Sequence, residues 1–476
     1  METREFRTIG HQVVDLLADY FERIEGLPVF PAVEPSTLAR LFDEPLPHSG
    51  ISSEAVLEEL ERKLLPYCTH VGHPGYFGLI TPSPNLMGIL GDFICSALNQ
   101  NIGVYSIGPS ATAMERQTVR WLTELAGYGD EAGGNLTSGG TMANFIGLKL
   151  ARDWASGQHA QHEGLEGRAA VYTSEERHVS VDKAVDAVGL GRAALRPLPT
   201  DDAFQVRLDA LEAAIAEDRK RGVRPVCIVG IFGTTNTGAV DPLPELRRIA
   251  DRERMWLHVD AAYGGGMLLS HERPMRNRGL ELADSITLDP HKWFYAPLDA
   301  GAVLVKDASQ LTRSFGIKPP YLSEQFTGSA DRYQYYVHGF EQSRRFRSLK
   351  VWMSLKRYGA AEIGRWIDAN VRQAERLYSL VERHPDFEAA ARPPMSAICI
   401  RYCGGKPEDS ARLHAEVVRR VEQGGRFWIS TTELKRRTWF RINPVNFRTR
   451  QEHMDDLMAL LENECRLALA RQAMGP

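Results

Sequence analysis

The sequence predicts an α/β protein with a mostly parallel central β-sheet. Between residues 86 and 370, short runs rich in β-branched and aliphatic residues alternate with helical segments. Strands that are buried on both faces and joined by crossover helices are typical of a parallel sheet. The length of 476 residues, with 43% hydrophobic and 25% charged residues, indicates a folded chain of more than one domain. The predicted strands are residues 169–173, 226–232, 256–259, 285–288 and 302–305, with helices at 208–221 and 243–254 between them.

A helical arm is predicted before this region. Apolar residues recur at spacings of three and four over residues 6–21, which predicts a helix. The prolines between residues 28 and 35 favour an extended stretch. A second helix is predicted from about Ser53, a plausible N-cap, to residue 65. Two helices on an extended arm bury little surface alone, so we expect residues 1–85 to pack across the twofold axis of a homodimer.

The end of the chain is predicted to form a small α+β domain over residues 371–476, which leaves 86–370 as the large domain. It follows a long helix near residues 348–358. Its predicted elements are helices at 368–383 and 410–423, strands near 397–402 and 439–442, and a terminal helix from Gln451.

Composition excludes several classes of protein. Lys and Arg number 57 against 61 Asp and Glu, a net charge of −4, without the basic excess that nucleic-acid binding needs. Six cysteines without a CxxC pair favour a reducing compartment. The first residues lack the apolar core of a signal peptide, and no run approaches the roughly 18 apolar residues of a membrane span. His159 and His162 have no evident third ligand. We therefore expect a cytoplasmic protein with no metal site and no nucleic-acid or membrane partner.

A lysine follows one predicted strand directly. In residues 285–293, SITLDPHKW, the turn after the strand carries Lys292 between His291 and Trp293. A nucleophilic lysine must be partly uncharged near neutral pH, which desolvation or cationic neighbours favour. A surface lysine in a loop would show the same pattern.

A carboxylate ends another predicted strand. In residues 258–266, HVDAAYGGG, Asp260 can hold a buried positive charge, and Ala262 leaves room for a flat ring. Pyridoxal phosphate needs this combination, because a carboxylate keeps its pyridine nitrogen protonated. An aspartate that caps a helix before a glycine-rich turn is the alternative.

Residues 135–144, NLTSGGTMAN, place a glycine turn before a predicted helix. Such a turn presents backbone N–H groups to an anion, and Thr141 adds a hydroxyl. A plain capped turn is equally compatible, and the lysine of a nucleoside-triphosphate loop is missing. A GxGxxA match at 189–194 follows a helical run rather than a strand, so it does not support nicotinamide binding.

Together these segments resemble the group II pyridoxal-phosphate-dependent decarboxylases, the family of aromatic-L-amino-acid decarboxylase. The resemblance runs in one order over nearly the whole chain. It is carried by EFR at 5–7, VFPAVEP at 29–35, TH at 69–70, the turn at 138–144, HVSVDKA at 178–184, GTT at 233–235, HVDAAY at 258–263, PHKW at 290–293, PPYL at 319–322 and RRFRSLK at 344–350. It implies an aspartate-aminotransferase-like fold, pyridoxal 5'-phosphate as the cofactor, and a homodimer with active sites at the subunit interface.

The resemblance also implies residue roles. Lys292 would bind the cofactor aldehyde covalently, Asp260 would pair with the pyridinium nitrogen, and His178 would stack on the ring. Lys292, His178 and Tyr321 would be catalytic, because Tyr321 or His178 would return a proton to the substrate Cα after CO₂ is lost. The cofactor-binding residues would be Gly140, Thr141, His178, Thr235, Asp260, Ala262, Asp289, His291 and Lys292.

The expected substrate pocket departs from the pattern of aromatic-specific members. Val71 stands where many have Trp, residues 79–82 (Leu-Ile-Thr-Pro) replace their Tyr-Phe-Pro-Thr, and Val104 stands where Phe is common. Each change removes an aromatic wall, so we expect a roomier or more aliphatic pocket. Its expected residues are Val71, Leu79, Ile80, Thr81, Ile102 and Val104.

Asp289 is a further departure, because Asn is frequent at this position. A phosphate dianion would repel its carboxylate unless the carboxyl were protonated or turned away. We expect the side chain to cap the turn at Pro290.

The main functional hypothesis is decarboxylation of an L-amino acid to the amine and CO₂, with aromatic substrates such as tyrosine, tryptophan, phenylalanine or DOPA favoured by the resemblance. One alternative is an oxygen-consuming aldehyde synthase, in which Tyr321 or His178 is typically altered, although both are present here. A decarboxylase of a non-aromatic L-amino acid is another. A protein that binds the cofactor without turnover is a third, opposed by the intact Lys292, Asp260 and Tyr321.

Overall fold

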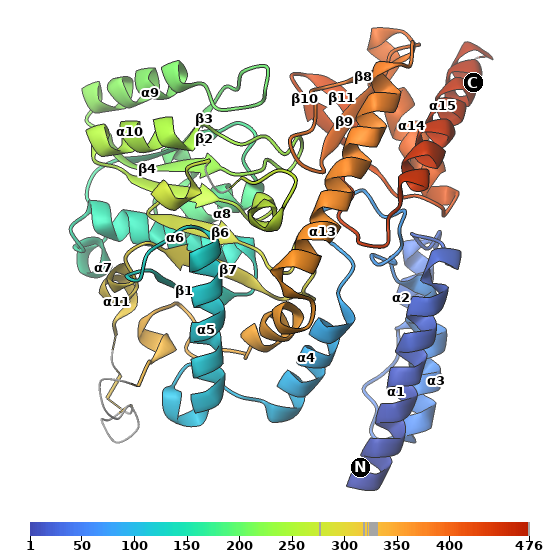
Figure 1. Cartoon of the computed structure of the whole chain (residues 1–476), viewed down its shortest axis with the longest axis horizontal. Coiled ribbons are helices and arrows are strands. Elements are labelled where there is room, and N and C mark those ends of the chain that lie inside the picture. The colour runs from blue at the N-terminus through green and yellow to red at the C-terminus, as the bar shows by residue number, and fades with distance from the viewer. Residues whose placement is uncertain (276–277, 318, 321, 323–331, 475–476) are drawn as a thin grey trace. The chain divides into compact units, whose positions relative to one another are not determined.

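The computed structural model describes residues 1–275, 278–317, 319–320, 322 and 332–474. The chain forms two compact units (Figure 1). One unit comprises Met1–Leu79, Arg372–Arg392 and Ile398–Pro476, and the other comprises Ile80–Val371 and Pro393–Ala397. The division at residues 85 and 370 stays a prediction about how the chain is organised.

The larger unit contains a seven-stranded sheet in the order β1-β7-β6-β5-β4-β2-β3. Neighbouring strands from β6 through β5, β4 and β2 to β3 are parallel, whereas β7 is antiparallel to both β6 and β1. The predicted mostly parallel α/β fold is therefore confirmed. The strands are β1 (Gly133–Thr137), β2 (Ala169–Ser174), β3 (Leu195–Leu198), β4 (Arg224–Ile231), β5 (Trp256–Asp260), β6 (Ser285–Leu288) and β7 (Gly301–Val305).

Helices cover both faces of this sheet. Val229 of β4 lies in a buried cluster with Leu148 of α6, whereas a Cβ on the next residue, Gly230, would point at Leu243 and Leu246 of α10. Since successive strand residues face opposite sides, α6 and α10 lie on opposite faces. The helices of this unit are α4 (Leu86–Leu98), α5 (Pro109–Leu125), α6 (Gly140–Ala155), α7 (Ala160–Glu163), α8 (Val179–Ala187), α9 (Leu208–Lys220), α10 (Leu243–Glu253) and α11 (Ser309–Phe315).

Five of the strands have their carboxyl ends at the same edge of the sheet. β2, β4, β5 and β6 are parallel, so their carboxyl ends meet there. β1 joins them because it is antiparallel to β7, which is itself antiparallel to β6. Ligands of open α/β sheets bind outside the carboxyl ends of the strands.

The smaller unit has an antiparallel sheet of four strands in the order β10-β11-β9-β8. Its core gathers Phe77, Leu377, Phe427, Phe440 and Leu461. The elements are α1 (Thr3–Arg23), α2 (Pro35–Leu41), α3 (Ser53–Lys63), β8 (Phe387–Ala389), β9 (Ile398–Tyr402), α14 (Ser410–Gln423), β10 (Ser430–Leu434), β11 (Arg437–Ile442) and α15 (Gln451–Met474).

Three details differ from the predicted elements. The side chain of Ser52, rather than Ser53, caps α3 by accepting a hydrogen bond from the N–H of Ala55. The helix predicted near 348–358 and the one at 368–383 belong to one element, α13 (Ser348–Glu382), which is broken at Gly359, where φ is 72°. Pro35 begins the short helix α2, because proline is favoured in the first turn of a helix.

Candidate functional site

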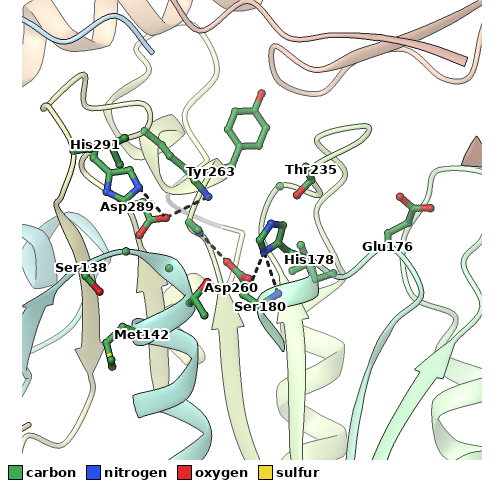
Figure 2. Close-up of a pocket in the computed structure, with 18 residues that line it drawn as sticks. Ser138, Met142, Glu176, His178, Ser180, Thr235, Asp260, Tyr263, Asp289 and His291 are labelled. Carbon is green, nitrogen blue, oxygen red and sulfur yellow. Dashed lines mark hydrogen bonds and ion pairs between the residues drawn. The ribbon is translucent and has the colours of Figure 1, made fainter. Parts of the chain in front are cut away.

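A cavity of about 350 Å³ lies where these strands end (Figure 2). Its walls come from the segments that follow β1, β2, β4, β5 and β6. The cavity brings together every residue that was predicted to bind the cofactor: Gly140, Thr141, His178, Thr235, Asp260, Ala262, Asp289, His291 and Lys292.

Lys292 projects from the turn after β6. Its backbone N–H donates to the carbonyl of Asp289 at 2.8 Å, and its side chain is 21% exposed. The following residue, Trp293, is fully buried and stacks on Tyr263 with ring centroids 4.9 Å apart. This anchor fixes the turn, so the lysine amine is directed into the cavity.

Asp260 is the last residue of β5 and is held at both carboxylate oxygens. Oδ2 accepts a hydrogen bond from Nδ2 of Asn144 at 2.9 Å, and Oδ1 accepts one from the N–H of Ala262 at 3.1 Å. N–H donors on both oxygens stabilise the ionised form. The side chain is therefore prepared to pair with a buried cation.

Asn144, on α6, is a positioning residue that sequence reasoning did not single out. Its Oδ1 accepts a hydrogen bond from Oγ1 of Thr287 at 2.7 Å and lies 2.9 Å from Nε2 of His258. Burial lowers the pKa of His258 to about 4, so this histidine is neutral at neutral pH. The available signal was its place one turn into the helix that the glycine turn opens.

His178 caps α8 and faces the cavity (Figure 2). Its Nδ1 accepts a hydrogen bond from the N–H of Ser180 at 3.2 Å, which leaves the ring proton on Nε2. The surrounding protein lowers the pKa of His178 by burial, and the nearby positive charge of Lys292 lowers it further. A neutral imidazole therefore lines the cavity.

The glycine turn forms a cradle beside this ring. Gly139 has φ 150°, and a Cβ there would lie 3.2 Å from Cε1 of His291. A Cβ on Gly140 would lie 2.8 Å from Oδ2 of Asp289. Any side chain at these two glycines would therefore fill the space. The space lies at the start of α6, where the free N–H groups of a helix favour an anion. Burial lowers the pKa of His291, so this side chain is a neutral donor or acceptor at the cradle.

Asp289 does not cap the turn at Pro290, so that expectation was wrong. Its side chain is almost fully buried, with Oδ2 lying 3.2 Å from Nζ of Lys292 and 3.5 Å from Nε2 of His291. Oδ1 is buried without a hydrogen-bond partner. The turn is closed instead by the Asp289 main-chain carbonyl.

These features together fit pyridoxal phosphate. An amine for its aldehyde, a carboxylate for its ring nitrogen and an anion cradle for its phosphate line one cavity. Among the described residues, no group of three or more His, Cys, Asp or Glu side chains is placed to hold a metal ion.

The remaining cavity wall contains residues that were not among the predicted site residues, although several belong to the motifs that carry the family resemblance. They are Ser138, Met142, Glu176, Ser180, Ile231, Gly233, Tyr263 and Leu298, besides Gly139 of the cradle. Oε2 of Glu176 accepts a hydrogen bond from Nδ2 of Asn236 at 3.0 Å. Its carboxylate adds negative charge to one side of the cavity (Figure 2).

The expected substrate-pocket residues lie elsewhere in the single chain. None of Val71, Leu79, Ile80, Thr81, Ile102 and Val104 lines this cavity. Ile102 packs with Ala111 and Phe346 in a buried cluster, and Val104 packs with Tyr336. Their substrate role stays a prediction, and Tyr321 lies outside the described residues.

Comparison with known proteins gives the family. The model of the pyridoxal-dependent decarboxylase conserved domain matches residues 35–403. An aromatic-L-amino-acid decarboxylase of Bacillus atrophaeus is 32% identical over 461 residues, which cover 96% of this chain and 95% of the relative. A phenylacetaldehyde synthase of Petunia hybrida is 34% identical over 409 residues, which cover 84% of this chain and 80% of the relative.

A solved structure agrees over almost the full length. The crystal structure of Oryza sativa TDC with PLP and tryptamine has a TM-score of 0.92 at 27% identity, covering 98% of this chain and 99% of that one. Within the described residues, no helix has the length and apolar character needed to cross a membrane. The chain therefore belongs to the pyridoxal-dependent decarboxylase family and is an amino-acid decarboxylase whose cofactor is pyridoxal phosphate.

Proposed function

We propose that the enzyme releases CO₂ from an aromatic L-amino acid and returns the amine. The observation that carries this proposal is the convergence of Lys292, Asp260 and His178 in one cavity. Bound pyridoxal phosphate supplies the electron sink that carbon dioxide loss requires.

Three residues of the chain have separate proposed roles around that cofactor. Lys292 would hold the cofactor aldehyde through its amine. Asp260, whose oxygens accept N–H bonds from Asn144 and Ala262, would pair with the ring nitrogen and favour its protonated form. His178, fixed by Ser180, would lie beside the ring and orient the substrate carboxylate for departure.

Return of a proton to the substrate Cα needs an acid near the cavity. His178 lines the cavity and can donate a proton there as an imidazolium, because the N–H of a neutral imidazole is too weak an acid. We assign this step to His178 or Tyr321, as the family resemblance implies. His178→Gln and Tyr321→Phe separate the two, because the variant that lacks the acid should release CO₂ faster than it releases amine.

An aromatic rather than an acidic substrate is supported by two observations. The relatives include an aromatic-L-amino-acid decarboxylase covering 96% of this chain. The Glu176 carboxylate lines the cavity, so an acidic substrate side chain would meet a like charge there. Glutamate and aspartate should therefore be poor substrates, and Glu176→Gln should improve their turnover relative to the aromatic amino acids.

Aldehyde synthesis is the second candidate, favoured by the 34% identity to the Petunia hybrida phenylacetaldehyde synthase. The presence of both His178 and Tyr321 supports simple decarboxylation instead. The test incubates the enzyme with tyrosine, tryptophan, phenylalanine, DOPA and glutamate, and measures CO₂, amine, aldehyde and peroxide. Amine equal to CO₂ supports the proposal. Peroxide and aldehyde equal to CO₂ would replace it with the synthase, and Lys292→Ala is the inactive control.

We further propose that the enzyme is a cytoplasmic homodimer. In the larger unit, α4 exposes Leu86, Leu90, Phe93, Ile94 and Leu98, with Phe93 49% exposed. Such an apolar face is typical of a surface that a second copy covers. A dimer would also provide a second copy to complete the substrate pocket that one chain leaves open. A monomer in sedimentation experiments at micromolar concentration would refute the dimer.

The cytoplasmic location is supported by the cysteines, all of which are free thiols, as expected in a reducing compartment.

A further inference from the structure

Asp289 places a carboxyl group against the anion cradle. It follows β6 and is 2% exposed. A Cβ on Gly140 would lie 2.8 Å from its Oδ2, so the carboxyl touches the start of α6, where the phosphate of the cofactor is expected. Its other oxygen, Oδ1, is buried without a partner.

The two buried carboxyl groups of the cavity have opposite surroundings. Asp260 accepts N–H hydrogen bonds on both oxygens, which stabilises its ionised form. Among the described residues, Oδ1 of Asp289 has no hydrogen-bond donor, and Oδ2 lies 3.2 Å from Nζ of Lys292 and 3.5 Å from Nε2 of His291. When two carboxyl groups of one site have contrasting environments, one can stay ionised while the other is neutral.

Cofactor binding removes the partner of Asp289 and adds an anion. Nζ of Lys292 must turn to the cofactor aldehyde, and the phosphate ester carries close to two negative charges at neutral pH, since its second pKa is about 6. His291 lies 3.5 Å away, but burial lowers its pKa, so it supplies no cation. The other acidic and histidine side chains that line the cavity are Asp260 on β5, Glu176 after β2 and His178 at the N-cap of α8. His178 is neutral because burial lowers its pKa, so none of the three adds a positive charge.

More distant charges do not supply the missing cation. Lys350 of α13 and Asp299 act on His291 with opposite signs, and they pair with each other at 3.7 Å. Lys350 also pairs with Asp92 at 2.9 Å. Among the described residues that line the cavity, Lys292 is the one basic side chain, so a carboxylate at Asp289 would face a phosphate dianion with no other cationic side chain there.

We propose that Asp289 takes up one proton from solvent when pyridoxal phosphate binds, and that the resulting carboxylic acid donates a hydrogen bond to the phosphate. The carboxylate and one proton give the acid, the phosphate stays a dianion, and the proton returns to solvent when the cofactor leaves. Asp289 thus makes retention of the cofactor depend on pH.

The test measures proton uptake during cofactor binding to the apoenzyme. Calorimetry at about pH 7.5 in two buffers of different ionisation enthalpy gives the number of protons taken up, and at that pH the phosphate is already a dianion. We expect the wild type to take up about one proton more than Asp289→Asn when pyridoxal phosphate binds, because proton changes at Lys292 and at the ring nitrogen are common to both proteins. Between about pH 7 and 8.5, the wild-type dissociation constant should rise about tenfold more per pH unit than that of Asp289→Asn.

Two controls locate the proton. Pyridoxal, which lacks the phosphate, reaches Lys292 in the same way and should give about one proton less uptake than pyridoxal phosphate. Asp299→Asn removes a carboxylate that also acts on His291 but pairs with Arg347 at 2.8 Å, and it should keep the wild-type proton uptake.

The outcomes are decisive in each direction. Equal uptake in Asp289→Asn and the wild type, or equal uptake with pyridoxal and pyridoxal phosphate, would each overturn the proposal. If Asp289→Asn does not fold, the comparison of the two cofactors on the wild type still decides. No step of the test uses turnover, so failure to decarboxylate aromatic amino acids would leave this inference untouched.

Discussion

Replacing Asn144 by alanine tests how the cavity keeps Asp260 charged. The Asn144 amide donates to Oδ2 of Asp260 at 2.9 Å and to Oγ of Ser180 at 2.9 Å. A hydrogen bond to a charged group contributes about 1.5–3 kcal/mol. Because about 1.4 kcal/mol corresponds to a factor of ten, loss of this bond should lower kcat roughly 10- to 150-fold at saturating cofactor.

The assay combines turnover, cofactor affinity and a double-mutant cycle. CO₂ release gives kcat and KM, and we expect the loss in kcat. If Asn144 acts through Asp260, its effect should shrink sharply in an Asp260→Asn background, because residues that share one interaction are not additive. Asn446→Ala is a matched control, since this buried amide donates to the carbonyls of Gly72 and His73 at 3.0 Å outside the cavity. It should lower the melting temperature and leave kcat unchanged.

A turnover number within twofold of the wild type for Asn144→Ala would refute this reasoning. Full additivity with Asp260→Asn would refute it as well, because both results would separate Asn144 from the charge on Asp260.

Three further predictions follow from the same geometry. Asp260→Asn leaves the charged ring nitrogen of the cofactor without its partner, which costs about 3–5 kcal/mol for a buried ion pair. Assays of CO₂ release should therefore show kcat lowered at least about 100-fold, and a loss below tenfold would contradict the proposed role of Asp260. Gly140→Ala puts a Cβ 2.8 Å from Oδ2 of Asp289, and such overpacking costs about 1–3 kcal/mol. Absorbance titration should therefore show a cofactor affinity roughly 5- to 150-fold weaker than that of the wild type, and an unchanged affinity would contradict the tight packing at Gly140. The pKa of His258 is about 4 in the folded protein and about 6.5 in the unfolded chain, so the unfolded state binds more protons below pH 6.5 and the folded state loses stability as pH falls. Urea titrations should therefore show that the free energy of unfolding drops by about 2 kcal/mol from pH 7 to 5 in the wild type and not in His258→Gln. Equal pH slopes in the two proteins would refute this prediction.

The sheet and most of the cofactor site could be predicted because their signals are local. Continuous apolar runs such as Val226–Ile231 mark strands buried on both faces. Asp260 and Lys292 follow such runs within a few residues, so the common edge of the parallel strands brings them together. The glycine turn before α6 similarly predicts an anion site from sequence alone, and its residues line the same cavity.

The other features depend on contacts between distant segments. Asn144 resembles any polar residue at the start of a helix, and its function becomes visible only when β5 and β6 place Asp260 and Thr287 against it. Asp289 was expected to cap its turn, but burial beside Lys292 directs the carboxyl to the amine. Strand β8 has three residues, too few to show a period. The predicted substrate-pocket residues do not line the cavity of the single chain, so their role stays a prediction.

The most direct test of the central claim is where the cofactor becomes attached. Incubation with pyridoxal phosphate, borohydride reduction and peptide mapping by mass spectrometry should give one adduct, on Lys292, with a visible absorption band before reduction. Lys292→Ala should give neither. A colourless protein, or an adduct on another lysine such as Lys183 with none on Lys292, would contradict the account.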